Sequence, residues 1–509
     1  MRHVSRAGKI AQESSKAEKY ALFGANRIFA VHSAASSIKK FFENISFVVL
    51  LNLLVKPGWV VVENLVQDRL GHAAFGTFTA LYALTLIFAS VSDLGMTQHA
   101  TKRVAADATF LPEYFPTILP LKGWLSLAFL GLIVATGFVL GYRGHTLTLL
   151  ALTGAGLLLM QYTQFLRGTL QASQRFNTDA LLSVLEKVLL LALVLLLLPA
   201  GLTLDSYIGA RTVATLLTFL VLYVLVSRLF GWQRYRLRWQ HARTVLRQSL
   251  PFALITLLYG LNERIDMVML ERLASPQEAG YYAGAYRWVD AVMMYLWTVL
   301  PLFFAKFAHA SARPSEQREL LWFGQRIITV PLLFVCAFVL FRGEVLFWQF
   351  THSTPAEIAH MAFCLKILFV NVLVHAFFAI YSTLLTSTNQ ERAVSALVAG
   401  SIVLNVGLNL LLLPRFGATA AALNTLWCAL FVSIGYVALV RGRARVAIPW
   451  SLLGRLGLAF GLLAAVWYGL QMWLHQWLLE SLGAGLAFGL ILLLLRIVKV
   501  EELRAVLRR

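Results

Sequence analysis

Charged residues are scarce in this sequence. Only 13% of its 509 residues are Asp, Glu, Lys or Arg, whereas 59% are hydrophobic and the mean hydropathy is +0.72. A soluble globular chain typically carries about 25% charged residues. The composition therefore excludes an ordinary soluble protein and predicts an all-α polytopic membrane protein.

Cysteines and long connecting loops are also scarce. Cys336, Cys364 and Cys428 all lie inside apolar runs, and none of them forms a Cys-x-x-Cys motif or a Cys/His cluster. We therefore expect packing residues here, and neither a disulfide nor a metal site. A membrane glycosyltransferase or polymerase usually carries catalytic carboxylates on a long loop at the membrane face. Because the sequence has no such loop, we expect no enzyme activity.

Long apolar runs dominate the sequence instead. A spanning helix needs about 20 mostly apolar residues. Fourteen such runs are present, and their approximate limits are 45–67, 73–97, 117–141, 146–168, 178–200, 205–228, 248–272, 280–306, 323–342, 358–387, 391–413, 417–440, 451–473 and 477–498. We therefore predict about 14 transmembrane helices joined by short loops.

The net charge of +20 lies mostly in alternate loops. If the N-terminus is cytoplasmic, the tails, loops and adjoining helix ends on that side hold 32 Lys and Arg, and the opposite loops and helix ends hold 5. This asymmetry predicts an even number of helices and two cytoplasmic termini. The basic, aromatic stretch 229–247 suits the cytoplasmic membrane surface, so we expect membrane lipids and no nucleic acid as its partner.

The runs divide the chain into five parts. Residues 1–44 form a cytoplasmic N-terminal segment, for which an interfacial amphipathic helix and a partly disordered tail are both open. Residues 45–228 hold helices 1–6, the linker follows at 229–247, and residues 248–440 hold helices 7–12. Residues 441–509 hold helices 13 and 14 and a basic tail.

The first and seventh helices end alike. The segment "ENLVQDRLGHAAFGTFTALY" (63–82) aligns with "DMVMLERLASPQEAGYYAGAY" (266–286) at an offset of about 203 residues. The alignment pairs Glu63 with Asp266, Asp68 with Glu271, and Gly76 with Gly280. An offset of six helices predicts a parallel internal repeat, which in transporters often has the substrate site between its halves.

The same segments resemble a known family. "LVKPGWVVVENLVQDRLGHAAFGTFTALYALTLIFASVSDLGM" (54–96) has a proline in helix 1, an "LG…FG" turn and a closing "DLGM". "SLPFALITLLYGLNERIDMVMLERLASPQEAGYYAGAYRW" (249–288) has "LP", an intramembrane Asp and "GYY…AY". Both are similar to polysaccharide-repeat flippases of the O-antigen, Wzx type in the MOP (MATE-like) superfamily.

The resemblance implies a fold and a function. It implies two six-helix lobes around a central cavity, followed by two C-terminal helices. It also implies a flippase of lipopolysaccharide synthesis, which moves an undecaprenyl-diphosphate-linked oligosaccharide from the inner to the outer leaflet by alternating access. The expected location is the bacterial cytoplasmic (inner) membrane, with other polysaccharide-assembly proteins as candidate partners. The alternative is a MATE-type, cation-coupled exporter of drugs or small molecules.

Cations inside the predicted spans are candidates for binding a diphosphate. Each intramembrane charge costs about 2.5–3.5 kcal/mol on insertion scales, so it usually faces a cavity or a partner. Because guanidinium and ammonium groups bind phosphate oxygens, we expect substrate-binding roles for Lys56, Arg264, Arg287 and Lys366. Lys122 and Arg211 lie near helix ends and are expected to snorkel to the membrane surface.

Intramembrane carboxylates are candidates for ion coupling. Glu63, Glu263, Asp266 and Asp290 could bind the H⁺ or Na⁺ that drives the cycle, and we expect no other cofactor. The structural alternative is an ion-pair network that joins helix 7 to helix 8. Asn262 and Asp266 share a helix face through their i, i+4 spacing, whereas Arg264 points the other way. Helix 7 is thus predicted to offer carboxylates to one side and a guanidinium to the other.

Overall fold

The computed structural model describes residues 58–97, 110–173, 175–230, 239–310, 313–444 and 449–498. Within these ranges every regular element is a helix. Eleven of the described helices are long and apolar enough to cross a membrane. The predicted all-α, multi-pass architecture is therefore confirmed. The predicted N-terminal segment 1–44 and Lys56 lie outside the described residues.

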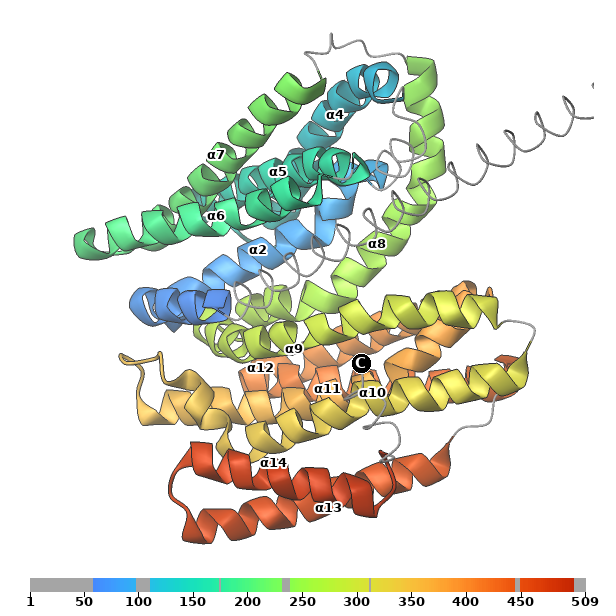
Figure 1. Cartoon of the computed structure of the whole chain (residues 1–509). Coiled ribbons are helices and arrows are strands. Elements are labelled where there is room, and N and C mark those ends of the chain that lie inside the picture. Colours follow the sequence, from blue (N-terminus) through green and yellow to red (C-terminus); the bar gives the residue numbers. More distant parts are fainter. Residues whose placement is uncertain are drawn as a thin grey trace, which may run out of the picture.

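The first lobe, here called the N-lobe, contains the helices up to residue 230 (Figure 1). A helix at 58–70 opens the described part of this lobe. It is followed by α2 (His72–Asp93), α4 (Phe110–Val139), α5 (Gly144–Ala172), α6 (Phe176–Leu197) with the 3₁₀ turn η1 (Leu198–Ala200), and α7 (Leu204–Phe230).

The second lobe, the C-lobe, lies beside the first (Figure 1). Its helices are α8 (Trp239–Leu273), α9 (Pro276–His309), α10 (Pro314–Arg342) with η2 (Gly343–Phe347), α11 (Pro355–Ser387), and α12 (Glu391–Leu439) with the π-helical turn η3 (Val440–Ala444). Helix α12 is interrupted at Gly417, which has non-helical backbone angles (φ 51°, ψ −133°) and lies three residues after Pro414. The break divides α12 into two helical parts that correspond to the two predicted spans, 391–413 and 417–440.

Two further helices, α13 (Trp450–Trp473) and α14 (Trp477–Leu494), pack on α10 away from the N-lobe (Figure 1). Trp467 is fully buried there, and its ring lies 5.7–6.1 Å from those of Phe334, Phe338 and Phe341. Arg342 forms a two-pronged ion pair with Glu480, which is 0% exposed. A desolvated carboxylate needs such a partner, so the pair fixes how α14 docks on α10.

One boundary differs from the prediction. Helix α8 begins at Trp239, so the second half of the predicted linker 229–247 is helical. The stretch from Trp239 to Arg247 contains neither glycine nor proline and includes Gln, Ala, Leu and Arg, which are good helix formers. Because the prediction followed apolar residues only, it missed the polar helical segment before the apolar run.

The two lobes meet closely where α2 crosses α9. A Cβ added at Gly76 would lie 1.8 Å from the carbonyl oxygen of Pro276, and one at Gly280 would lie 2.1 Å from that of His72. Only glycine allows the two backbones to approach this far. These are the two glycines that the internal repeat aligns. The repeat thus places equivalent positions of both lobes at one crossing, which closes this end of the lobe interface.

A second aligned pair reinforces the closed end. Asp68 of the N-lobe accepts hydrogen bonds from Thr351 (2.9 Å) and from the backbone of His352 (2.9 Å), which follow α10 in the C-lobe. Glu271 of the C-lobe accepts one from Tyr142 (2.8 Å), which follows α4 in the N-lobe. Each carboxylate, at the end of the first helix of its lobe, therefore binds the loop after the third helix of the other lobe, as a parallel repeat requires.

Candidate functional site

Two cavities of similar size lie on either side of the α8–α9 pair. The inter-lobe cavity, of about 330 Å³, is lined by residues of 58–70, α2, α7, α8 and α9. The C-lobe cavity, of about 320 Å³, is lined by α8, α9, α11 and α12. Tyr286 and Asp290 of α9 line both. Both volumes lie in the usual range for small-molecule sites.

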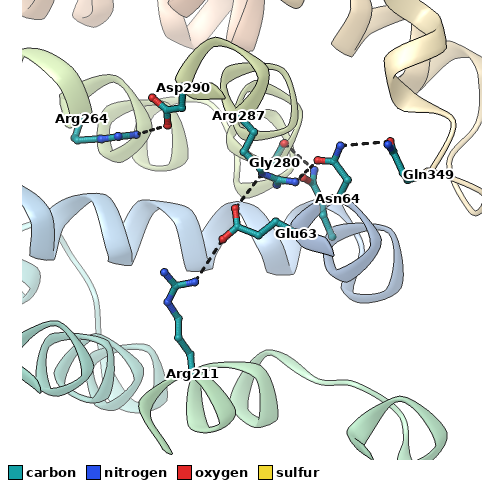
Figure 2. Close-up of polar contacts among 9 residues, drawn as sticks. Glu63, Asn64, Arg211, Arg264, Gly280, Arg287, Asp290 and Gln349 are labelled. Atoms are coloured by element: carbon teal, nitrogen blue, oxygen red, sulfur yellow. Dashed lines mark hydrogen bonds and ion pairs between the residues drawn. The ribbon is translucent and has the colours of Figure 1, made fainter. Parts of the chain in front are cut away.

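The centre of the inter-lobe cavity is a carboxylate between two guanidinium groups. Glu63 lies 3.5 Å from Arg211 of the N-lobe and 3.7 Å from Arg287 of the C-lobe (Figure 2). Arg287 also donates hydrogen bonds to Asn64 and Gln67, which are both fully buried. A C-lobe arginine is thus held by three side chains of the N-lobe, so it is sensitive to how the two lobes are placed.

Arg264 and Asp290 form a second ion pair in the same cavity, with 3.3 Å between Nη1 and Oδ2 (Figure 2). Aromatic rings support the cations, since the guanidinium of Arg287 lies 4.4 Å from the ring of Phe75 and that of Arg211 lies 4.6 Å from Tyr82. Among the described residues, three guanidinium groups and two carboxylates line the cavity. The cavity therefore carries an excess of one positive charge.

The C-lobe cavity has the opposite charge. Its described lining includes Glu263, Asp266 and Asp290 but neither Lys nor Arg. Asp266 is buried and accepts hydrogen bonds from Asn409 (2.7 Å) and Thr425 (3.1 Å), which are uncharged. Asn409 also donates to Asn405 (2.9 Å). A buried carboxylate among neutral oxygen-bearing side chains is suited to binding a small cation or a proton.

The predicted division of the seventh helix is confirmed. Arg264 lines the inter-lobe cavity, and Glu263 and Asp266 line the C-lobe cavity. The expected pairing between helices 7 and 8 is also present, as the contact between Arg264 and Asp290. The repeat alignment, by contrast, does not extend to equal surroundings for Glu63 and Asp266. Glu63 lies at the interface and contacts both lobes, whereas Asp266 faces the interior of its own lobe.

The comparisons with known proteins agree with this architecture. A sequence model described as "Polysaccharide biosynthesis protein" matches residues 41–304, which is more than half of the chain. The chain belongs to this family. It is 22% identical over 464 residues to a probable low-salt glycan biosynthesis flippase, Agl15, of Haloferax volcanii, covering 90% of this chain and 94% of that protein.

Solved structures of low sequence identity share the fold of this family member. The lipid II flippase MurJ in an inward closed conformation matches with a TM-score of 0.72 and 12% identity, over 87% of this chain and 97% of MurJ. An inward-facing multidrug resistance MATE transporter of the MOP superfamily matches with a TM-score of 0.62 and 16% identity, over 78% and 97%. The chain thus has the MOP-superfamily fold that its sequence resembles.

Not every predicted cation lies at these cavities. The ammonium of Lys366 lies 3.7 Å from Glu344, and the residue lines neither cavity. Arg211 was expected to snorkel to the surface, but it lines the inter-lobe cavity and contacts Glu63. Arg211 lies near the start of α7, which suggested contact with the membrane surface. The inter-lobe cavity extends to this part of α7, so the side chain lies in the cavity instead. A matching carboxylate in another helix, Glu63, is the signal that could have found it.

No metal centre is formed by the described residues. Within the described ranges there is no group of three or more His, Cys, Asp and Glu that could hold a metal ion. Cys336, Cys364 and Cys428 are buried free thiols, separated along α10, α11 and α12.

Proposed function

We propose that this protein is a flippase that moves an undecaprenyl-diphosphate-linked oligosaccharide from the inner to the outer leaflet of the cytoplasmic membrane, with O-antigen-type repeat units as the substrate. The observation that carries the proposal is the cationic inter-lobe cavity with Arg211, Arg264 and Arg287. Family membership, and the flippase names of Agl15 and MurJ, support transport of a lipid-linked glycan.

The chemistry of the cavity suits a diphosphate. Guanidinium groups bind phosphate oxygens through paired, charge-assisted hydrogen bonds. In this structure Glu63 supplies the negative charge between Arg211 and Arg287. A diphosphate carries more charge and more acceptor oxygens than one carboxylate. It can therefore replace Glu63 at both guanidinium groups and hold the two lobes together around the headgroup.

The position of the closed end supports a proposal of alternating access. With both termini in the cytoplasm, the crossing of Gly76 and Gly280 faces the outside of the cell. In this state the headgroup enters from the inner leaflet. Rocking of the two lobes then separates α2 from α9 at the glycine crossing and exposes the inter-lobe cavity to the outer leaflet. Asp68 and Glu271 release their partner loops in the same step.

Ion coupling is assigned to the C-lobe cavity. Asp266 is buried, and no Lys or Arg of the described chain lines the cavity around it, so a proton or Na⁺ would relieve its isolated negative charge. The Thr425 hydroxyl lies 3.1 Å from Asp266 and Asn405 lines the same cavity, so the oxygen atoms of both could join Asp266 in binding a small cation. We therefore expect Asp266→Asn to abolish the dependence of flipping on an ion gradient.

A second candidate function is export of an organic cation. The anionic, aromatic C-lobe cavity favours it, since such a lining attracts a lipophilic cation. Export of a cation would, however, give the three arginines of the inter-lobe cavity no role beyond ion pairing. The two functions predict opposite ligand charges, so one assay can separate them.

The deciding experiment uses purified protein in liposomes. Flipping of fluorescent undecaprenyl-diphosphate oligosaccharide is measured with and without Na⁺ and proton gradients, and uptake of tetraphenylphosphonium is measured in parallel. We expect glycolipid flipping by the wild type and its loss in Arg264→Ala and Asp266→Ala, with Trp427→Ala as the exposed control. Wild-type rates in both variants, or transport of the cation alone, would overturn the proposal.

A further inference from the structure

The C-lobe cavity contains polar groups that ion coupling does not use. Asn262 and Glu263 of α8 and Asn371 and His375 of α11 all line it. None of the four forms a hydrogen bond to another residue within the described ranges. Glu263 and His375 are exposed and Asn262 and Asn371 are half-buried, so their polar atoms are accessible from the cavity. Such groups therefore point to a ligand that supplies both donors and acceptors.

Aromatic rings line the same space. Tyr259 of α8, Tyr286 and Trp297 of α9, and Phe378 of α11 all face the cavity. Along α11 the lining extends from Asn371 to Thr383, which is about 18 Å at the helical rise per residue. Flat apolar faces and amide groups are thus distributed along an elongated space, rather than gathered around a single point as in a site for one ion.

A sugar fits this combination. Each hydroxyl of a sugar can donate and accept a hydrogen bond, as amides and carboxylates require. The C–H face of a pyranose ring is apolar and packs on an aromatic ring. A lipophilic cation would use the rings and carboxylates, but it would cover Asn262, Asn371 and His375 with a group that cannot hydrogen-bond to them.

The position of the cavity connects it to the proposed diphosphate site. Tyr286 and Asp290 line both spaces, so a molecule with its diphosphate near Arg264 and Arg287 has its next chemical group beside the C-lobe cavity. In a lipid-linked oligosaccharide the group attached to the diphosphate is the first sugar. The C-lobe lining carries three carboxylates and no Lys or Arg among the described residues, so it repels an acidic sugar.

We propose that the C-lobe cavity is a sugar-binding subsite, which takes neutral or amino sugars next to the diphosphate and discriminates against uronic acids. This inference rests on the proposed flippase function. It assigns the selection of the glycan to the C-lobe cavity. Trp297 and Asn371 are the specificity-determining residues. Trp297 supplies a stacking face, and Asn371 supplies a donor and an acceptor.

The test measures binding of three probes to the purified full-length protein. These are bare polyprenyl diphosphate, the same carrier with one N-acetylhexosamine, and the same carrier with one hexuronic acid. The variants are Trp297→Ala and Asn371→Ala. The control is Trp427→Ala, because Trp427 is 57% exposed and lines neither cavity.

We expect the wild type to prefer the N-acetylhexosamine carrier over the other two by about tenfold, the effect of one or two hydrogen bonds and a stacking face. Each variant should lose most of that preference, and the control should keep it. Binding of the bare carrier shows that a variant is folded. If the wild type binds all three carriers equally, or if both variants keep the preference, the subsite is overturned and the flippase proposal stands. If no carrier binds, both are overturned.

Discussion

The inter-lobe cavity and the C-lobe cavity are nearly equal in volume and share Tyr286 and Asp290, yet their charges are opposite. The difference arises from helical phase. Arg264 and Asp266 are two residues apart, so their side chains leave α8 about 200° apart around its axis. Helix α8 therefore presents a guanidinium group to the inter-lobe cavity and carboxylates to the C-lobe cavity.

The two cavities also differ in what holds them together. Both lobes build the inter-lobe cavity, so its shape depends on lobe closure at Gly76 and Gly280. The C-lobe cavity is built by helices of one lobe and can persist when the lobes move. A transporter that rearranges around its substrate is thus expected to bind the headgroup at the first and to keep its ion at the second.

Among the variants proposed here, Arg287→Ala should cause the largest loss of glycolipid flipping. Arg287 contacts Glu63, Asn64 and Gln67, so its removal takes a guanidinium group from the inter-lobe cavity and leaves a half-buried carboxylate and two buried amides with fewer partners. Losing one partner of a buried charge network costs about 3–5 kcal/mol. We expect glycolipid flipping to fall by more than about 100-fold.

The matched variant Arg287→Lys keeps the charge but loses the planar fork. It should fold and retain partial flipping, which separates loss of function from loss of structure. Ion binding at the C-lobe cavity should persist in both variants when they are folded. Full activity of Arg287→Ala would contradict the assignment of the diphosphate to this cavity.

The second effect concerns lobe closure and follows Gly280→Ala. The added methyl group would collide with the backbone of His72, which can move only if the lobes separate. Binding of polyprenyl diphosphate should weaken by about tenfold or more, while Na⁺ or proton binding at the C-lobe cavity should change little. Spin-label distances between the two lobes should lengthen at this end.

Gly209→Ala serves as the control, because nothing lies within 4 Å of the Cβ position at Gly209. If Gly280→Ala alters neither the distances nor the binding, the crossing does not limit lobe closure. Equal losses of binding at both cavities would show that the C-lobe cavity also depends on the lobe interface.

Glu63→Gln is expected to raise the affinity for polyprenyl diphosphate, whereas Gly280→Ala lowers it, and the change should be smaller. The substitution keeps the shape of the side chain but removes the negative charge between Arg211 and Arg287. Affinity for bare polyprenyl diphosphate should rise several-fold, because the ligand no longer competes with a carboxylate. Turnover should fall, since the headgroup leaves more slowly. Weaker binding would show that Glu63 organises the site and is not displaced by the ligand.

The smallest effect is expected for Lys366→Ala. Lys366 contacts Glu344, which is 63% exposed, and lines neither cavity. Exposed ion pairs contribute about 0–1 kcal/mol. Flipping and carrier binding should therefore stay within about twofold of the wild type. A large loss would restore the sequence-based expectation that this lysine binds substrate.

Much of the fold could be predicted from the sequence because apolar run length and loop charge are properties of single helices. The fourteen spans and the repeat depend on such local patterns. The start of α8 at Trp239 could not be found in the same way, because a polar helical turn has no apolar signal. Helical phase was enough to place Arg264 and Asp266 on opposite sides.

The parts of the site that were missed depend on contacts between distant helices. Arg211 contacts a carboxylate 148 residues earlier in the chain, and Asp266 contacts Asn409 143 residues later. Nothing near Arg211 in the sequence shows that α7 brings it to the lobe interface. Likewise, the depth of Lys366 in its helix suggested a cavity, but depth does not specify which side of the helix the cavity occupies.

The most direct test of the central claim, that the inter-lobe cavity binds an anionic headgroup, is a binding titration of the purified protein with bare polyprenyl diphosphate at increasing salt. We predict saturable binding by the wild type that weakens as salt rises, and weaker binding in Arg211→Ala and Arg264→Ala with Lys366→Ala unchanged. Binding that is equal in all four proteins, or binding of tetraphenylphosphonium in place of the diphosphate, would contradict the claim.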